Sequence, residues 1–238
     1  MQAHLSLLAA LLLSPLAAPK VAVGSPLLCQ EFTIGNAKSL PWEGGMGPRK
    51  DYDKSRLIAD VATILKTEPN LVVRMETLRR AALYTRGDRA LAWELLGRAG
   101  LGVLEQAAIG SKESIVWFDA GFLAACLDQM DVGLRFKAGV AEGQVGYGYL
   151  MRALVNARAE KNDQIATMEF AAALVVHPGM RRDGPSEVDV ERYVRHIDVT
   201  RLGAAPGSLL AKNLAAHEER FDQGKDSWAR SRSKKGKN

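Results

Sequence analysis

Helical spacing of the apolar residues is the strongest constraint in this sequence. Between Asp51 and Phe221 apolar side chains return every three or four positions, and no strand-like alternation runs longer than a few residues. Of the 238 residues, 34 are alanine, which favours helices packed closely on helices and is depleted in sheets. The sequence therefore predicts an all-α protein of about eight or nine short antiparallel helices.

Proline and glycine set the bounds of the predicted helices. Pro69 ends the first and His177-Pro178-Gly179 ends a later one, while Ser186 and Ser208 are the predicted N-caps of the last two. Helix in the glycine-rich stretch 133–148 is expected to be weak or tightly packed against a neighbour. The predicted helices cover 57–68, 71–85, 89–104, a segment starting near 111, and then 149–160, 164–176, 186–200 and 208–221.

The first 24 residues resemble a secretory signal peptide. Leu5 to Ala18 is almost entirely apolar, too short to cross a bilayer of about 30 Å but suited to the h-region of a signal. Ala22 and Gly24 supply the small residues that signal peptidase requires, so we expect cleavage after Gly24 and export to the periplasm or the exterior. A buried N-terminal helix is the alternative.

A Gly/Pro-rich segment, residues 25–53, separates this leader from the helices, and we call it the arm. Pro41 and Pro48 exclude a long helix there, and the glycines match no phosphate-binding loop. Phe32 and Trp42 give the arm enough apolar area to lie against the helices. We therefore predict an ordered, irregular arm packed on a helical domain at 54–222.

The net charge of +5 is confined to the C-terminal end of the chain. Residues 225–238 hold six basic residues and one acidic residue, whereas residues 25–224 hold 25 basic and 26 acidic residues. The body therefore has no basic field to attract nucleic acid. We predict a monomer with a disordered basic tail at 223–238, which either aids solubility or makes weak contact with an anionic surface.

Two cysteines, Cys29 and Cys126, fall in the predicted mature chain. In an oxidising compartment they could join the arm to the helical body as a disulfide. The alternative is that Cys126 is a small buried apolar residue. Neither has a CxxC partner, so redox catalysis and a zinc knuckle have no support.

Spacing within the helical region resembles the tetratricopeptide repeat. Ala166, Phe170, Ala173 and Pro178 follow the second-helix pattern A-x3-F-x2-A-x4-P of that family. Trp117-x2-Ala-Gly-x2-Ala is similar to the first-helix pattern and lies 33 residues before Leu150, against a family period of about 34. The resemblance implies a short solenoid of stacked helical hairpins; an unrelated helical bundle is the alternative.

Such a solenoid implies a concave groove that binds a peptide or a partner protein. The apolar floor would carry arginines toward each end, which suits a segment bearing a carboxylate. The favoured alternative is that the chain's own arm or last helix covers this floor. The predicted partner-binding residues are Arg80, Phe118, Phe122, Met151, Val155 and Arg158.

No catalytic or metal-binding motif accompanies this architecture. His177, His196 and His217 lie about twenty residues apart, without an HExxH or GxSxG pattern or a carboxylate cluster at ligand spacing. The sequence therefore predicts no catalytic residue, cofactor or metal. The expected function is an exported scaffold or binding module for a protein or peptide; the alternative is a cell-envelope hydrolase or lyase whose acids meet only in the fold.

Overall fold

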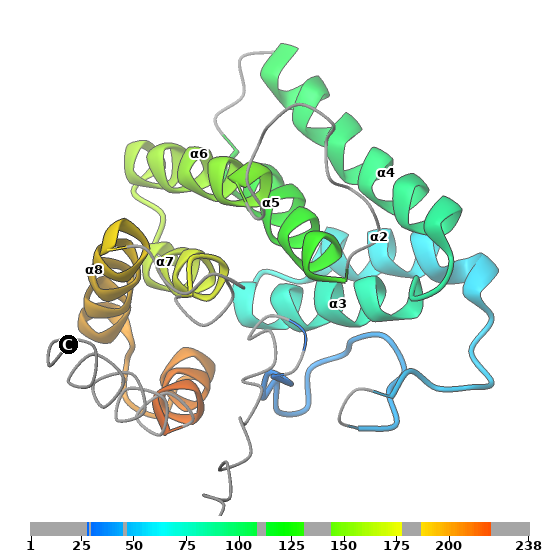
Figure 1. Cartoon of the computed structure of the whole chain (residues 1–238), viewed down its shortest axis with the longest axis horizontal. Coiled ribbons are helices and arrows are strands. Elements are labelled where there is room, and N and C mark those ends of the chain that lie inside the picture. The colour runs from blue at the N-terminus through cyan, green and yellow to red at the C-terminus, as the bar shows by residue number, and fades with distance from the viewer. Residues whose placement is uncertain are drawn as a thin grey trace, which may run out of the picture.

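The computed structural model of this chain is all-helical over the residues that it describes, apart from the irregular arm (Figure 1). These residues are 28, 30–44, 47–108, 113–130, 144–177 and 187–219. Within these ranges the one β-type pairing is a single bridge between Trp42 and Pro48. The predicted signal at 1–24, Cys29 and the tail at 223–238 lie outside the described residues.

The helices follow the predicted order closely, with two shifted starts. α5 begins three residues after the predicted start near Ser111, and α6 begins five residues before Tyr149. Gly146 and Gly148 are therefore helical, although glycine disfavours helix. The bounds are η1 Lys54–Arg56, α2 Leu57–Thr67, α3 Leu71–Tyr84, α4 Arg89–Ala108, α5 Ser114–Gln129, α6 Gln144–Glu160, α7 Ile165–Val175 and α8 Glu187–Gly203, followed by a helical segment over 209–219.

Side-chain caps fix the start of α3 and of the helical segment over 209–219, among others. Asn70 accepts a hydrogen bond from the Val72 N–H over 2.9 Å at the start of α3. The predicted N-cap Ser208 is confirmed, because its Oγ accepts from the Ala211 N–H over 3.1 Å. None of the described helices is long and apolar enough to span a bilayer.

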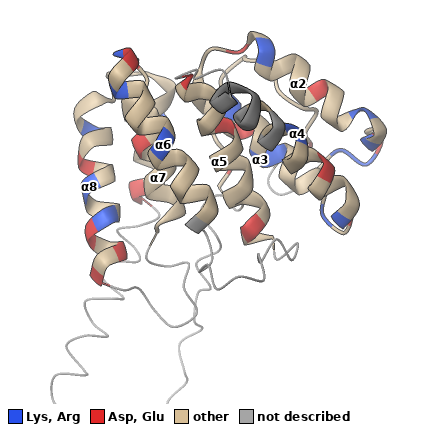
Figure 2. Cartoon of the chain, turned by 90° about the horizontal axis from the view of Figure 1, so that it is seen from above, with Lys and Arg blue, Asp and Glu red and all other residues tan. Residues whose placement is uncertain are grey.

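α3 is almost completely enclosed, since Arg80 is its one residue that is not buried. Consecutive helices pack on one another from α4 to α8, and α3 contacts α2, α5 and α7 (Figure 1). Charged residues of both signs are interspersed over the helices (Figure 2), in keeping with the near-neutral body of the sequence. An arrangement as stacked repeats stays a prediction.

Glycine explains the close crossing of α5 and α6. A Cβ added to Gly121 would lie 2.9 Å from the Gly146 carbonyl oxygen, and one added to Gly146 would lie 2.8 Å from the Ala125 nitrogen. Because real Cβ atoms do not approach backbone atoms so closely, both positions require glycine. For residues 144–148, the described part of the stretch 133–148, this crossing is the tightly packed alternative that was expected, and Gly146 tolerates helix because a neighbouring helix lies directly against it.

Candidate binding groove

The arm lies along α3, and buried side chains of the helices bond to its main chain. Tyr84 on α3 both donates to an arm carbonyl and accepts from an arm N–H. The bonds are Arg79 Nη1 to Leu28 O (2.9 Å), Phe32 N to Glu76 Oε2 (3.0 Å), Arg80 Nη1 to Leu40 O (2.7 Å), Tyr84 Oη to Pro41 O (2.6 Å) and Arg49 N to Tyr84 Oη (3.1 Å). Most of the polar contacts of α3 with the arm are therefore to the arm main chain, beside two to arm side chains: Ser39 with Thr77 over 2.9 Å and Glu31 with Arg80 over 3.7 Å.

The helical segment over 209–219 holds the arm from a second direction. Asn213 accepts from the Thr33 N–H and donates to the Thr33 carbonyl, both over 2.8 Å. The Asn213 side chain is almost fully buried. This two-way bond to one residue is the pattern by which an amide side chain binds an extended main chain.

Three charged side chains of α3 form a bonded cluster against the arm. Glu76 and Arg79 are fully buried and joined by two hydrogen bonds of 2.8 and 2.9 Å, and Arg80 donates to Glu76 over 2.6 Å. Burying such charges costs several kcal/mol per ion, roughly, unless every donor and acceptor finds a partner. The arm supplies the missing partners, because its Leu28 and Leu40 carbonyls accept from the two arginines.

Phe32 anchors the arm in the apolar core. Its ring is 1% exposed and lies 6.1 Å from the ring of Phe122 and 6.4 Å from that of Phe170, centroid to centroid. Phe118 stacks on Phe122 at 6.1 Å, and neither of these two side chains is exposed. Phe122 is therefore covered by the arm residue Phe32, and a partner can reach it only after the arm has moved.

The other predicted partner-binding residues lie on α3 and α6. Arg80 is bound to Glu76 and to the arm, whereas Met151, Val155 and Arg158 lie on α6, where Met151 is partly buried against the core. Val155 is 55% exposed, and the Arg158 side chain, 56% exposed, donates to Glu169 over 2.5 Å. Arg80 and Phe122 thus both contact the arm, whereas Val155 and Arg158 are exposed on α6.

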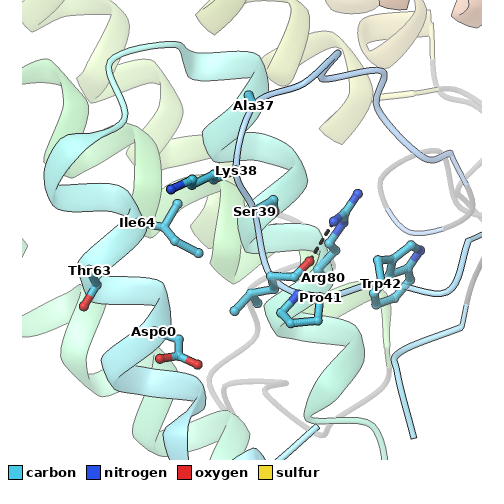
Figure 3. A pocket seen from close by; sticks show the side chains of 10 residues that line it. Ala37, Lys38, Ser39, Pro41, Trp42, Asp60, Thr63, Ile64 and Arg80 are labelled. Carbon is cyan, nitrogen blue, oxygen red and sulfur yellow. Dashed lines mark hydrogen bonds between the residues drawn. The ribbon is translucent and has the colours of Figure 1, made fainter. Parts of the chain in front are cut away.

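An open pocket of about 530 Å³ lies between the arm and α2 (Figure 3). The arm forms one wall of the pocket and the exposed side of α2 forms the other. Its lining residues are Ala37, Lys38, Ser39, Leu40, Pro41 and Trp42 of the arm, Asp60, Thr63 and Ile64 of α2, and Arg80 of α3.

The three histidines match no catalytic or metal-binding motif in the sequence, and all of them lie in buried polar clusters. Each is less than 5% exposed, and Tyr193 on α8 donates to or accepts from His217 over 3.1 Å. The rings of His177 and His217 are 5.9 Å apart. The sequence offered one signal of this proximity. Successive histidines are 19 and 21 residues apart, which is about the length of one helix and its connection.

His196 joins α6, α7 and α8 through one chain of polar contacts. Its Nδ1 contacts Glu169, and its Nε2 lies 3.0 Å from the Tyr147 hydroxyl. Glu169 in turn accepts from Arg158. Burial raises the pKa of the Tyr147 hydroxyl, so this tyrosine is a neutral structural link at ordinary pH rather than an activated base.

Cys126 is a fully buried free thiol in the structure. Burial raises the pKa of the thiol, which keeps it protonated and unreactive. The possible pairing with Cys29 involves a residue outside the described ranges. Among the described side chains, no group of three or more His, Cys, Asp or Glu residues could hold a metal ion.

Comparison of this sequence with known proteins identifies no relative, so the function is inferred from the geometry described above. No protein-family model, curated protein or solved structure matches this sequence.

Proposed function

We propose that this chain is an exported helical-hairpin scaffold, of tetratricopeptide-like architecture, that binds an extended segment of a protein or peptide. The proposed binding site is the groove along α3 that its own arm fills. The observation that carries the proposal is the bonding of the arm main chain by Glu76, Arg79 and Arg80. Side chains that bind a main chain can accept other sequences in the same position.

Peptide-binding grooves commonly combine hydrogen bonds to the peptide main chain with a pocket for one aromatic side chain. Hydrogen bonds to the backbone hold any extended segment, and a pocket for one large side chain selects among them. Phe32 occupies that pocket between Phe122 and Phe170. An incoming segment with an aromatic residue would find the same donors, acceptors and ring contacts.

The arm is then a tethered competitor for the groove. A tethered segment acts at an effective concentration in the millimolar range, so a partner must bind tightly or act when the arm is released. Export and the repeat architecture belong to the same proposal. They are supported by the apolar leader Leu5–Ala18 and by the packing of consecutive helices from α4 to α8.

The alternative, a cell-envelope hydrolase or lyase, receives less support from the geometry. Glycoside hydrolysis uses two carboxyl groups that face one cleft. Among the residues that line the pocket beside the arm, Asp60 is the one carboxylate.

The experiment uses a fluorescein-labelled peptide with the sequence of residues 30–43, added to the mature chain and followed by anisotropy. Phe32→Ala in the chain should loosen the arm, so this variant should bind the labelled peptide at least about tenfold more tightly than the unaltered chain. Asn36→Ala, at an exposed arm position, is the matched control and should leave the affinity unchanged. Absence of peptide binding to a Phe32→Ala chain with an intact helical circular-dichroism spectrum would contradict the proposal.

A further inference from the structure

We infer that the open pocket between the arm and α2 binds a short peptide with an aliphatic side chain and free termini, its carboxylate on Lys38 and its ammonium group on Asp60. This inference rests on the proposed function, since it gives the chemistry of a peptide that the molecule would take. It concerns space that the arm leaves open rather than the groove that the arm fills.

The pocket has the size and lining of a ligand site. Its volume of about 530 Å³ lies within the range of about 300–1,000 Å³ that is usual for small-molecule sites. Ala37 and Pro41 on the arm and Ile64 on α2 give the pocket an apolar lining (Figure 3), and the lining residue Leu40 is 1% exposed. An aliphatic side chain would bury its surface there.

Lys38 supplies the cationic end. The side chain is exposed and extends over α2 beside Ile64 (Figure 3), and it forms no ion pair with any carboxylate that the structure describes. Arg80 also lines the pocket, but its guanidinium group is already bonded to Glu76 and to the Leu40 carbonyl. Lys38 is therefore the lining cation with donors to offer, and a carboxylate is the group that it would bind.

Asp60 supplies the anionic end, on the opposite side of Ile64 from Lys38 (Figure 3). Its Oδ2 accepts from the Tyr52 hydroxyl over 2.8 Å and its Oδ1 from Arg56 over 3.3 Å. A carboxylate has about four acceptor positions, so roughly two remain for a ligand. An ammonium group fits this end because it carries only donors.

The two ends together select the ligand class. A fatty acid would leave the open acceptor positions of Asp60 unused, and an inorganic anion would leave the apolar lining uncovered. A short peptide with free termini satisfies the cation, the anion and the apolar surface at once.

Such a ligand would also hold the arm in place. It would contact the arm through Lys38 and Pro41 and the body through Asp60 and Ile64, so it would bind the closed arrangement better than one with the arm displaced. Linkage then requires that a partner which displaces the arm weakens the peptide, and that the peptide weakens the partner.

The test measures binding of the tripeptide Ala-Leu-Ala to the mature chain by isothermal titration calorimetry. The peptide is used in four forms: with both termini free, N-acetylated, C-amidated, and blocked at both ends. The chain is used unaltered and as Lys38→Met, Asp60→Asn and Lys66→Met. Lys66 is an exposed lysine of α2 that does not line the pocket, so its variant is the matched control.

We expect the form with free termini to bind most tightly to the unaltered chain and to the Lys66→Met control. Amidation should weaken binding about tenfold in these two chains and leave it unchanged in Lys38→Met. N-acetylation should likewise weaken binding about tenfold in the unaltered chain and in Lys66→Met, and it should leave the affinity of Asp60→Asn unchanged. The inference is supported if amidation no longer weakens binding to Lys38→Met and acetylation no longer weakens binding to Asp60→Asn.

Equal affinity for all four forms, or no binding of any form at millimolar concentration, would overturn the inference. An amidation penalty that persists in Lys38→Met would overturn it as well. Failure here remains distinguishable from failure of the proposed function, because the labelled arm peptide reports on the α3 groove and the tripeptide reports on the pocket.

Discussion

The main-chain N–H of Phe32 donates to Glu76 Oε2 over 3.0 Å, so a carboxylate at the centre of α3 binds a residue 44 positions earlier in the chain. The same carboxylate accepts from Arg79 and Arg80. One side chain therefore joins the arm to two cations inside the protein.

Glu76→Ala should destabilise the protein severely. The substitution leaves the fully buried Arg79 without its carboxylate, and breaking a buried pair in this way costs about 3–5 kcal/mol. Urea unfolding followed by circular dichroism measures the loss. Asp51→Ala, which breaks an exposed pair with Arg49, is the control and should leave the free energy of unfolding unchanged; equal effects of the two variants would contradict the role of Glu76.

Two glycines in α6 should respond oppositely to alanine. Gly146→Ala places a methyl group 2.8 Å from backbone atoms of α5, whereas Gly148→Ala meets nothing within 4 Å. We expect Gly146→Ala to lower the melting temperature. Gly148→Ala should raise the free energy of unfolding by about 0.5–1 kcal/mol, because alanine favours helix over glycine. Thermal unfolding of both variants checks the pair, and a stabilised Gly146→Ala would show that the helices do not cross as described.

Stability should fall as the solution is acidified below about pH 6.5. Burial and the nearby His217 lower the pKa of His177 from its ordinary value of 6.5 to about 3. Between these values the unfolded chain binds a proton that the folded chain does not, so unfolding becomes more favourable as the pH drops. The loss approaches about 1.4 kcal/mol per pH unit for this one group.

The variant His177→Gln isolates this contribution. Between pH 7 and pH 5 the unaltered protein should lose about 2 kcal/mol more stability than the variant does. Urea unfolding at both pH values supplies the comparison. The same pH dependence in both chains would show that His177 does not stay neutral inside the fold.

The Cys126 thiol should be hidden in the native protein and free after unfolding. Because the Cys126 side chain is fully buried, we expect that a thiol reagent does not modify Cys126 under native conditions. In guanidinium chloride without a reductant, the thiol should react. If no thiol reacts even then, Cys126 is joined to Cys29 as the disulfide alternative requires.

Local physical chemistry made the helices predictable. Proline after Glu68 and a capping serine before residue 209 act within a few positions of themselves. The early start of α6 was not predictable in this way, because Gly146 disfavours helix locally. Its close contact with α5 outweighs that local preference.

The candidate site depended on contacts between distant positions. Helical spacing placed Phe118 and Phe122 on one face of α5, one turn apart, but it did not decide what covers them. Phe32 lies against Phe122 because the arm returns along α3. The histidines show the same limit, since no local rule brings residues 177 and 217 to a ring separation of 5.9 Å.

By itself the sequence determined the all-helical class, the order and approximate bounds of the helices, the irregular arm and the confinement of excess charge to the tail, because each follows from neighbouring residues. Only the tertiary structure decided that Glu76, Arg79 and Arg80 hold the arm main chain and that a pocket opens beside it. Those contacts join positions up to 51 residues apart, and their free energy depends on burial, which no short stretch of sequence encodes.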